Sequence, residues 1–264
     1  PRIGFVPTLV RVATDLISSL RSRSFSWLFA GMMNVYAVAG ANTALDLYMF
    51  SYFWDIGSTG AMMVFLGYPI GGIVGALLGP VLFAKFGKRA GLICGVLGWA
   101  IFQTLPVVLR LLGFFPENGE AILLPLLVGL KALSGASTIQ ADIAFGSMVA
   151  DVVDEHELAT EKRQEGIFFA ATFFAGKATM GIGAILSGFA LDFIAWPRGS
   201  DIQTAADIPA ETLFDLGIIY GPIFGIFGLV AAWCFSNYRL SRERHAEILG
   251  ALAERRKAGI VETS

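Results

Sequence analysis

Charged residues are scarce in this sequence of 264 residues, and their scarcity excludes an ordinary soluble domain. Asp, Glu, Lys and Arg make up only 15% of the chain, whereas soluble proteins contain about 25%. Hydrophobic residues reach 55% without counting the 31 glycines, and the mean hydropathy is +0.68. No soluble core could bury so much apolar surface, so lipid must solvate part of this chain.

Cysteine and histidine are equally sparse, which removes two other kinds of structure. Cys94 and Cys234 each lie near an apolar run, where a thiol acts as a small hydrophobic side chain rather than as a disulfide partner. His156 and His245 are too isolated in the sequence to suggest a metal site, and we expect no cofactor. The chain opens at Pro1 without a signal segment, so we expect it to begin inside a longer protein.

Six stretches are long and apolar enough to cross a membrane, because a spanning helix needs about 20 mostly apolar residues. They cover residues 27–53, 60–83, 90–112, 121–147, 166–195 and 212–237. We predict an all-α membrane protein whose six-span bundle covers residues 26–238. Residues 1–25 form a cytoplasmic linker with an amphipathic helix over Val10–Leu20, and residues 239–264 form a cytoplasmic tail.

Glycines recur every four residues along the second predicted span. Gly67, Gly71, Gly75 and Gly79 share one side of that helix. Small residues at this spacing let helix backbones approach closely within a membrane. The pattern predicts a tightly packed bundle.

Basic residues are sorted by side, which predicts the orientation of the chain. All but four of the 19 Lys and Arg residues fall in segments that six spans place on one face. Arg110 and Arg198 lie on the opposite face, and Lys131 and Lys177 lie within spans. Because the basic face is normally cytoplasmic, we predict that both termini are cytoplasmic.

Several polar side chains fall inside the predicted spans, where a charge must face a cavity or a partner. Lys177 is the strongest candidate, because it lies too deep in the fifth span to reach either surface. It acts either on a substrate or ion, or as a structural ion-pair partner of another helix. Lys131 lies nearer the end of the fourth span, where it can extend outward to water. The other candidates for substrate binding or coupling are Asn42, Asp46, Gln140 and Asp142.

An acidic cluster follows the fourth predicted span at the cytoplasmic edge. Asp151 and Asp154 lie near Arg163 in the sequence. Such a cluster can form ion pairs that open and close with a conformational change, and we treat these three residues as a candidate cytoplasmic gate. The alternative is a solvated loop whose ion pairs contribute little.

Several motifs are similar to those of one transporter family. The run Ser147-Met-Val-Ala-Asp-Val-Val-Asp154 precedes Glu165-Gly166 and the span that carries Lys177. The segments 21–25, 87–89 and 238–240 fit the same pattern. The chain resembles the C-terminal six spans of the glycoside–pentoside–hexuronide:cation symporters, the melibiose-permease branch of the major facilitator superfamily.

The resemblance implies a twelve-span symporter of the bacterial inner membrane that works by alternating access, with the solute bound at the midplane between two six-helix halves. It implies a role for Lys177 near the sugar and cation sites, and an inner gate formed by Asp151, Asp154 and Arg163. It also implies that the coupling ion, Na⁺ or H⁺, binds mainly to the N-terminal half. At Asp142 this chain departs from the family's sugar-facing aromatic residue, which permits a more polar or cationic solute.

The partners expected on this interpretation are a small solute, a monovalent cation, the lipid bilayer and the N-terminal half, with no nucleic acid. A transporter of the same fold with an amphiphilic lipid as cargo is the first alternative, and a scaffold subunit is a minor one. Another is an intramembrane enzyme that holds metal diphosphate through Asp151 and Asp154. Such sites need several carboxylates around two or more metal ions, and no second acidic motif lies in a facing span. We therefore predict a transporter and not an enzyme.

Overall fold

The computed structural model describes residues 20, 22–198, 204–257 and 259. The predicted linker and its amphipathic segment, residues 10–20, lie almost entirely outside the described residues. Within the described ranges the chain is helical and contains no strand. Six of its helices are long and apolar enough to cross a membrane, which confirms the predicted fold class.

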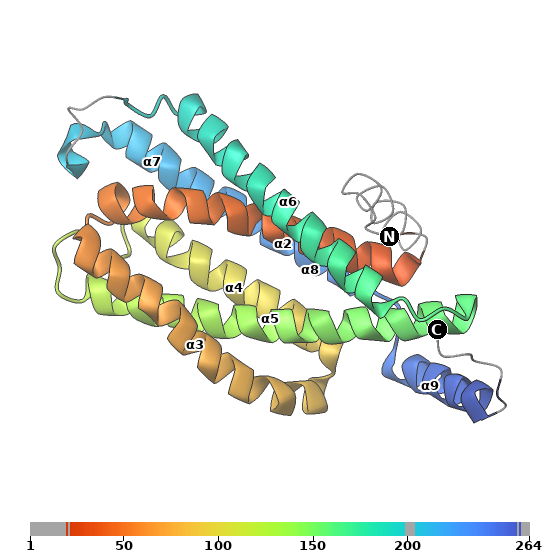
Figure 1. Cartoon of the computed structure of the whole chain (residues 1–264). Helices are drawn as coiled ribbons and strands as arrows, with labels where there is room; N and C mark the ends of the chain where they lie inside the picture. Colours follow the sequence, from red (N-terminus) through yellow and green to blue (C-terminus); the bar gives the residue numbers. More distant parts are fainter. Residues whose placement is uncertain (1–19, 21, 199–203, 258, 260–264) are drawn as a thin grey trace.

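The helices form an elongated bundle (Figure 1). The first span joins α2 (Arg23–Tyr48) to a π-helical turn over Met49–Phe53, and the next two are α3 (Gly57–Phe86) and α4 (Lys88–Leu111). They are followed by α5 (Leu123–Thr160) and α6 (Glu165–Phe193). The sixth span joins α7 (Ala210–Ile218), the turn Ile219–Ile223 and α8 (Phe224–Ser236). A short turn, Ala205–Asp207, precedes it, and α9 (Arg242–Lys257) ends the described chain.

The sixth span contains a wide π-helical turn around Pro222. Proline lacks the backbone N–H that an α-helix would use at this position, and π-helical segments occur mostly as single turns inside α-helices. The turn sets the direction of α8 relative to α7.

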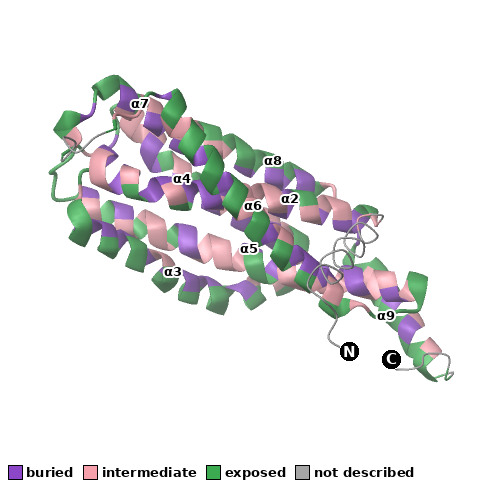
Figure 2. Ribbon diagram, turned by 45° about the horizontal axis from the view of Figure 1, so that its top comes forward, coloured by how far each residue is buried: buried purple, intermediate pink, exposed green. Residues whose placement is uncertain are grey.

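Helix packing divides the bundle into two groups. α5 packs against α3 and α4, whereas α2 packs against α6 and α8, and α8 joins the groups through α4. α5 makes few contacts with α2 or α6. Side chains on α3 and α6 are largely exposed in the isolated chain (Figure 2).

Glycine allows the closest helix contacts, as the sequence predicted. A Cβ atom added at Gly71 would collide with the carbonyl of Ala132 on α5, and neighbouring positions Gly67 and Gly75 also face α5 backbone. On α6, Gly183 meets the backbone of Ala37 in the same way. α3 therefore crosses α5, and α6 crosses α2, at backbone-to-backbone distance.

α5 is longer than the sequence analysis predicted. Its predicted span ended at residue 147, but the helix continues to Thr160 and ends at Glu161 in the left-handed conformation. Asp151 and Asp154 therefore lie on helical turns, so the expectation of a loop there is wrong. How much their ion pairs contribute stays a prediction. Helix α9 packs against this extension and buries Ile248 and Leu252 there.

Candidate functional site

Four polar residues from four helices meet inside the bundle and form what we call the buried polar cluster: Asp46, Gln103, Lys131 and Tyr220. The Lys131 Nζ atom lies 3.7 Å from an Asp46 carboxylate oxygen and donates to the Gln103 side-chain oxygen at 3.4 Å. The Tyr220 hydroxyl donates to Asp46, and the Gln103 amide donates to that hydroxyl. The cluster thus holds a lysine and an aspartate in the same low-dielectric space.

Aromatic rings complete the surroundings of Lys131. Its ammonium lies 5.9 Å from the ring centre of Phe50 and 6.0 Å from that of Tyr68. Cations at such distances are attracted to the faces of aromatic rings. The lysine is therefore held by a carboxylate, an amide oxygen and two rings.

The structure corrects the prediction for Lys131. Its side chain is only 14% exposed and points at Asp46, so it does not extend outward to water. Asp46 is buried, and its carboxylate pairs with Lys131 rather than with Lys177. Sequence reasoning missed Gln103 and Tyr220, although a glutamine inside an apolar span was a usable signal.

A line of polar residues continues from this cluster toward α6. Tyr68 on α3 lies within electrostatic range of both Asp46 and Asp142, and Tyr36 on α2 lies within range of Asp142. The Tyr36 ring in turn packs at Gly176, next to Lys177. Helices α2, α3 and α5 thus contribute polar side chains to one line through the spans, and this line reaches α6 at Gly176.

Lys177 and Asp142 are exposed in the isolated chain. Lys177 makes no hydrogen bond or ion pair with any residue that the structure describes. Gln140 is half-buried, and it too has no such partner within the described ranges. Asn42 is buried, and its side-chain oxygen has no hydrogen-bond partner in the described part of the chain. The structure therefore brings Asp46 to Lys131 but leaves Lys177 open.

A second constellation lies at the end of the bundle where α5 meets α9, and we call it the terminal charge cluster. Arg163 donates to Asp154 at 3.3 Å, to Glu157 at 2.9 Å and to Glu165 at 2.8 Å. Arg256 of α9 donates to the other oxygen of Glu157 at 2.9 Å. Hydrogen bonds to Glu165 and Glu157 raise the pKa of Arg163 above its usual value, so the guanidinium stays charged.

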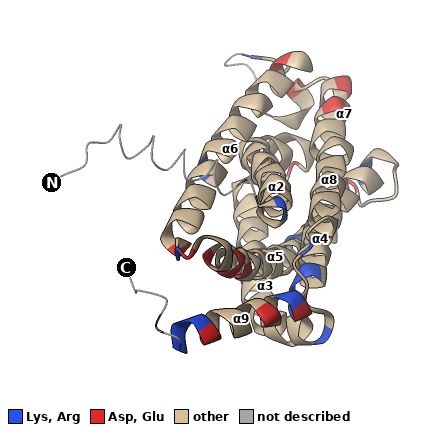
Figure 3. Cartoon of the chain, turned by 90° about the vertical axis from the view of Figure 1, so that its right-hand side faces the viewer, with Lys and Arg blue, Asp and Glu red and all other residues tan. Residues whose placement is uncertain are grey.

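Asp151 takes different partners from those that the sequence suggested. It lies 2.7 Å from the Lys88 ammonium at the start of α4 and 3.5 Å from the His245 ring of α9. His245 also lies 3.0 Å from Asp154. Figure 3, which looks along the bundle from this end, shows acidic residues on α5 and charges of both signs on α9. No sequence pattern indicates that Lys88, His245 or Arg256 belongs to this cluster, because only the fold brings their separate elements together.

Comparison with known proteins identifies the family to which these residues belong. A sequence model of the MFS/sugar transport protein family, where MFS denotes the major facilitator superfamily, matches residues 7–242. The chain belongs to this family. A protein of Synechocystis sp. (strain ATCC 27184 / PCC 6803 / Kazusa), described as an uncharacterized symporter, is 30% identical over 135 residues. That match covers 50% of this chain and 24% of the relative.

Family membership and the six apolar helices together make this chain an integral membrane protein of the MFS/sugar transport family. In such a protein a buried ion pair and a line of polar side chains are functional candidates, because hydrocarbon does not tolerate isolated charges. The arrangement has the chemical means to bind a polar solute: carboxylates that accept from hydroxyls, ammonium groups that donate to them, and tyrosines that can stack.

Proposed function

We propose that this chain forms one half of a cation-coupled symporter for a glycoside-like or other small polar solute. The observation that carries the proposal is Lys177, an exposed ammonium inside a spanning helix without a partner among the described residues. A charge in hydrocarbon costs at least about 2.5 kcal/mol, so this lysine faces either water or a carboxylate outside the described residues. A solute cavity between two six-helix halves supplies both.

The remaining details of the proposal follow from the charge sorting and the motifs. The second half of the protein is an N-terminal bundle of six helices, which covers the exposed sides of α3 and α6. The branch is that of the melibiose permeases, both termini are cytoplasmic, and the membrane is the bacterial inner membrane. The symporter description of the Synechocystis relative supports cation coupling and transport rather than catalysis.

The mechanism uses the polar line between α2, α3, α5 and α6. Lys177 pairs with a carboxylate of the N-terminal half, or with Asp142, in different conformations. The coupling ion, Na⁺ or H⁺, competes with the lysine for the same carboxylates. Binding of ion and solute must then affect one another reciprocally. The terminal charge cluster, with Arg163 between Asp154 and Glu157, closes the cytoplasmic side.

Uptake measurements on the full-length protein test this role of Lys177. We expect Lys177→Met to reduce concentrative solute uptake at least tenfold while the melting temperature stays within about 2 °C, since a lysine that faces a water-filled path and exchanges its partners contributes little to stability. Lys131→Met is the matched control for a structural lysine, because it removes the same charge from a buried ion pair. The melting temperature of this variant should fall because Asp46 loses its cation. Uptake by Lys177→Met with normal ion dependence would refute coupling, and a joint loss of uptake and stability would make the lysine structural.

An amphiphilic lipid remains the second candidate cargo, and one observation favours it. Phe173 and Phe174 are 62% and 56% exposed, one helical turn before Lys177. An ammonium beside two exposed rings could hold the headgroup and the first methylenes of such a cargo. Uptake of a labelled sugar against that of a labelled lysolipid in the same proteoliposomes distinguishes the two.

A further inference from the structure

A large cavity lies away from the polar line, at the end of the bundle where α9 begins. It has a volume of about 940 Å³ and lies between the end of α3, the start of α4, the end of α8 and the first turn of α9. Among the described residues, its walls carry four basic side chains, Lys88, Arg89, Arg239 and Arg242, and one carboxylate, Asp151. None of these residues belongs to the buried polar cluster.

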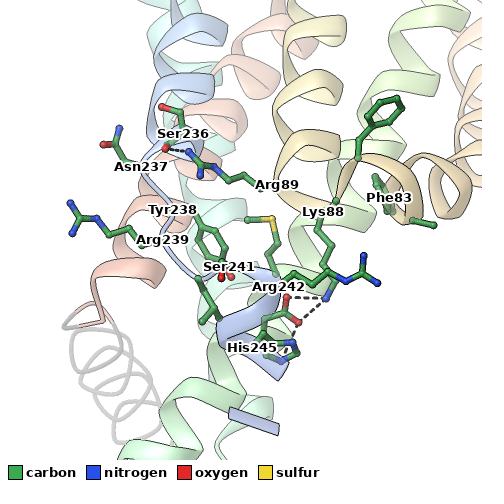
Figure 4. A pocket seen from close by; sticks show the side chains of 16 residues that line it. Phe83, Lys88, Arg89, Ser236, Asn237, Tyr238, Arg239, Ser241, Arg242 and His245 are labelled. Carbon is green, nitrogen blue, oxygen red and sulfur yellow. Dashed lines mark hydrogen bonds and ion pairs between the residues drawn. The ribbon is translucent and has the colours of Figure 1, made fainter. Parts of the chain in front are cut away.

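Asp151, the one carboxylate among the described wall residues, is already neutralised. Asp151 is held by Lys88 at 2.7 Å and lies 3.5 Å from His245 (Figure 4). The Arg89 guanidinium is directed at the backbone carbonyl of Ser236. Arg242 is exposed and makes no side-chain hydrogen bond or close ion pair within the described ranges. The cavity therefore carries an excess of positive charge with donors still available.

Neighbouring side chains place the cavity at the depth of the lipid headgroups. Trp233 is one helical turn from the cavity residue Asn237, which donates to its carbonyl at 2.8 Å. The Trp233 ring is 59% exposed and packs edge-on against Trp27 at 5.2 Å. Tryptophan is enriched where hydrocarbon meets headgroups, and the exposed Phe86 ring, also 59% exposed, lies at the cavity wall.

We propose that this cavity binds the headgroup of an anionic phospholipid, with Arg89 and Arg242 as the principal phosphate contacts. Guanidinium groups bind phosphate oxygens through paired hydrogen bonds, and basic pockets between spanning helices suit anionic lipid headgroups. The acyl chains would descend along the exposed apolar sides of α4 and α8, where Ile101 and Leu229 are 52% and 62% exposed. The inference uses only the membrane-spanning fold and does not depend on symport.

Native mass spectrometry of the full-length protein, delipidated and titrated with phosphatidylglycerol, tests the site directly. We expect one tightly held phosphatidylglycerol and at least tenfold weaker binding of zwitterionic phosphatidylcholine. Each arginine near an anionic lipid surface should contribute about fivefold in affinity. Arg89→Gln/Arg242→Gln should therefore weaken the binding of phosphatidylglycerol about 25-fold, and Arg242→Gln alone about fivefold.

Arg23→Gln/Arg244→Gln is the matched control, because it removes the same charge from exposed residues outside the cavity. We expect it to change the affinity less than twofold. An equal loss in this control would overturn the proposal in favour of general surface attraction, as would equal binding of phosphatidylcholine. Displacement of the bound lipid by millimolar glycerol 3-phosphate would assign the cavity to a soluble phosphate instead. If the double variant fails to fold, Arg242→Gln decides the question, since that residue has no structural partner within the described ranges.

Binding should also be independent of the proposed transport chemistry. Lys177→Met should retain the bound phosphatidylglycerol with unchanged affinity even if its uptake is lost. Conversely, loss of lipid binding with normal uptake would leave the proposed symport function intact. The two proposals can therefore fail separately.

Discussion

Asp46 connects the buried polar cluster, because its carboxylate forms an ion pair with the Lys131 ammonium and accepts a hydrogen bond from the Tyr220 hydroxyl. The side chains of Asp46 and Lys131 are 9% and 14% exposed, so water cannot replace either partner. Removal of one member of a buried ion pair leaves the other charge unsatisfied, which costs about 3 kcal/mol or more.

We therefore expect Asp46→Asn to lower the free energy of unfolding by about 3 kcal/mol. Thermal unfolding of the purified full-length protein, followed by tryptophan fluorescence, measures the change. Asp46→Asn/Lys131→Met removes both charges and should recover part of the loss. If the destabilisation of the double variant instead equals the sum of the effects of Asp46→Asn and Lys131→Met, the two residues are not energetically coupled.

Sequence reasoning found only part of this cluster. An aspartate inside an apolar span is conspicuous, so Asp46 could be singled out from the sequence alone. The sequence shows how deep Lys131 lies along its helix but not which way its side chain points around the helix axis. For this reason the expectation that Lys131 extends outward to water is wrong. Tyr220 carried no signal, since a tyrosine is equally at home in an apolar span or at a membrane interface.

At the scale of helices, the α2–α6 contact offers a test with an internal control. Gly183 faces the Ala37 backbone of α2, whereas Gly181, two residues earlier on α6, has no described residue within 4 Å of an added Cβ atom. We expect Gly183→Ala to destabilise the protein by about 1–3 kcal/mol, because the helices must separate. Gly181→Ala should be neutral by the same thermal unfolding. Equal melting temperatures for the two variants would contradict the close crossing.

The contact of α9 with the end of α5 supplies a second prediction at this scale. Glu157 is buried and holds both Arg163 and Arg256. Arg163→Ala or Arg256→Ala alone leaves Glu157 with one cation and should lower the free energy of unfolding by about 1 kcal/mol. The double variant leaves the buried carboxylate without a cation from either arginine and should lower it by about 3 kcal/mol or more. Hydrogen–deuterium exchange over α9 measures the resulting loss of protection.

Arg244→Ala is the control for this experiment, because Arg244 pairs with Glu247 on the exposed side of α9 and with no other acidic residue that the structure describes. Its exchange should match that of the unaltered protein. Purely additive effects of Arg163→Ala and Arg256→Ala would indicate that Glu157 is solvated and that α9 is held by Ile248 and Leu252 instead.

The spans themselves were predictable because lipid imposes a length and a composition on each. The extension of α5 was not predictable, because its last turns carry as many acidic side chains as a loop would. They stay helical because Lys88, Arg163, His245 and Arg256 hold them from three other segments. Arg163 is close to them in the sequence and could be predicted, but Lys88, His245 and Arg256 are far away, so no local pattern indicates their part in the arrangement.

For the whole molecule, the charge sorting and the fold agree on where the polar and basic ends lie. The starts of α2, α4 and α6 and the whole of α9 lie at one end of the bundle (Figure 1). The six-span topology that sorted the basic residues is therefore the topology of the structure. Which end faces the cytoplasm stays a prediction, as does the second half of the protein.

We propose an arrangement in which Asp142 and Lys177 line a water-filled solute path, whereas the exposed sides of α4 and α8 face lipid. Cysteine labelling of the full-length protein in native membranes tests it most directly, in a background carrying Cys94→Ala and Cys234→Ala. Thiols react as thiolates, which form in water and not in hydrocarbon. We predict that Asp142→Cys and Lys177→Cys react with a membrane-impermeant thiosulfonate. Ile101→Cys and Leu229→Cys, which are also exposed in the isolated chain, should remain unlabelled. Labelling at Ile101 and Leu229 with none at Asp142 and Lys177 would contradict the account.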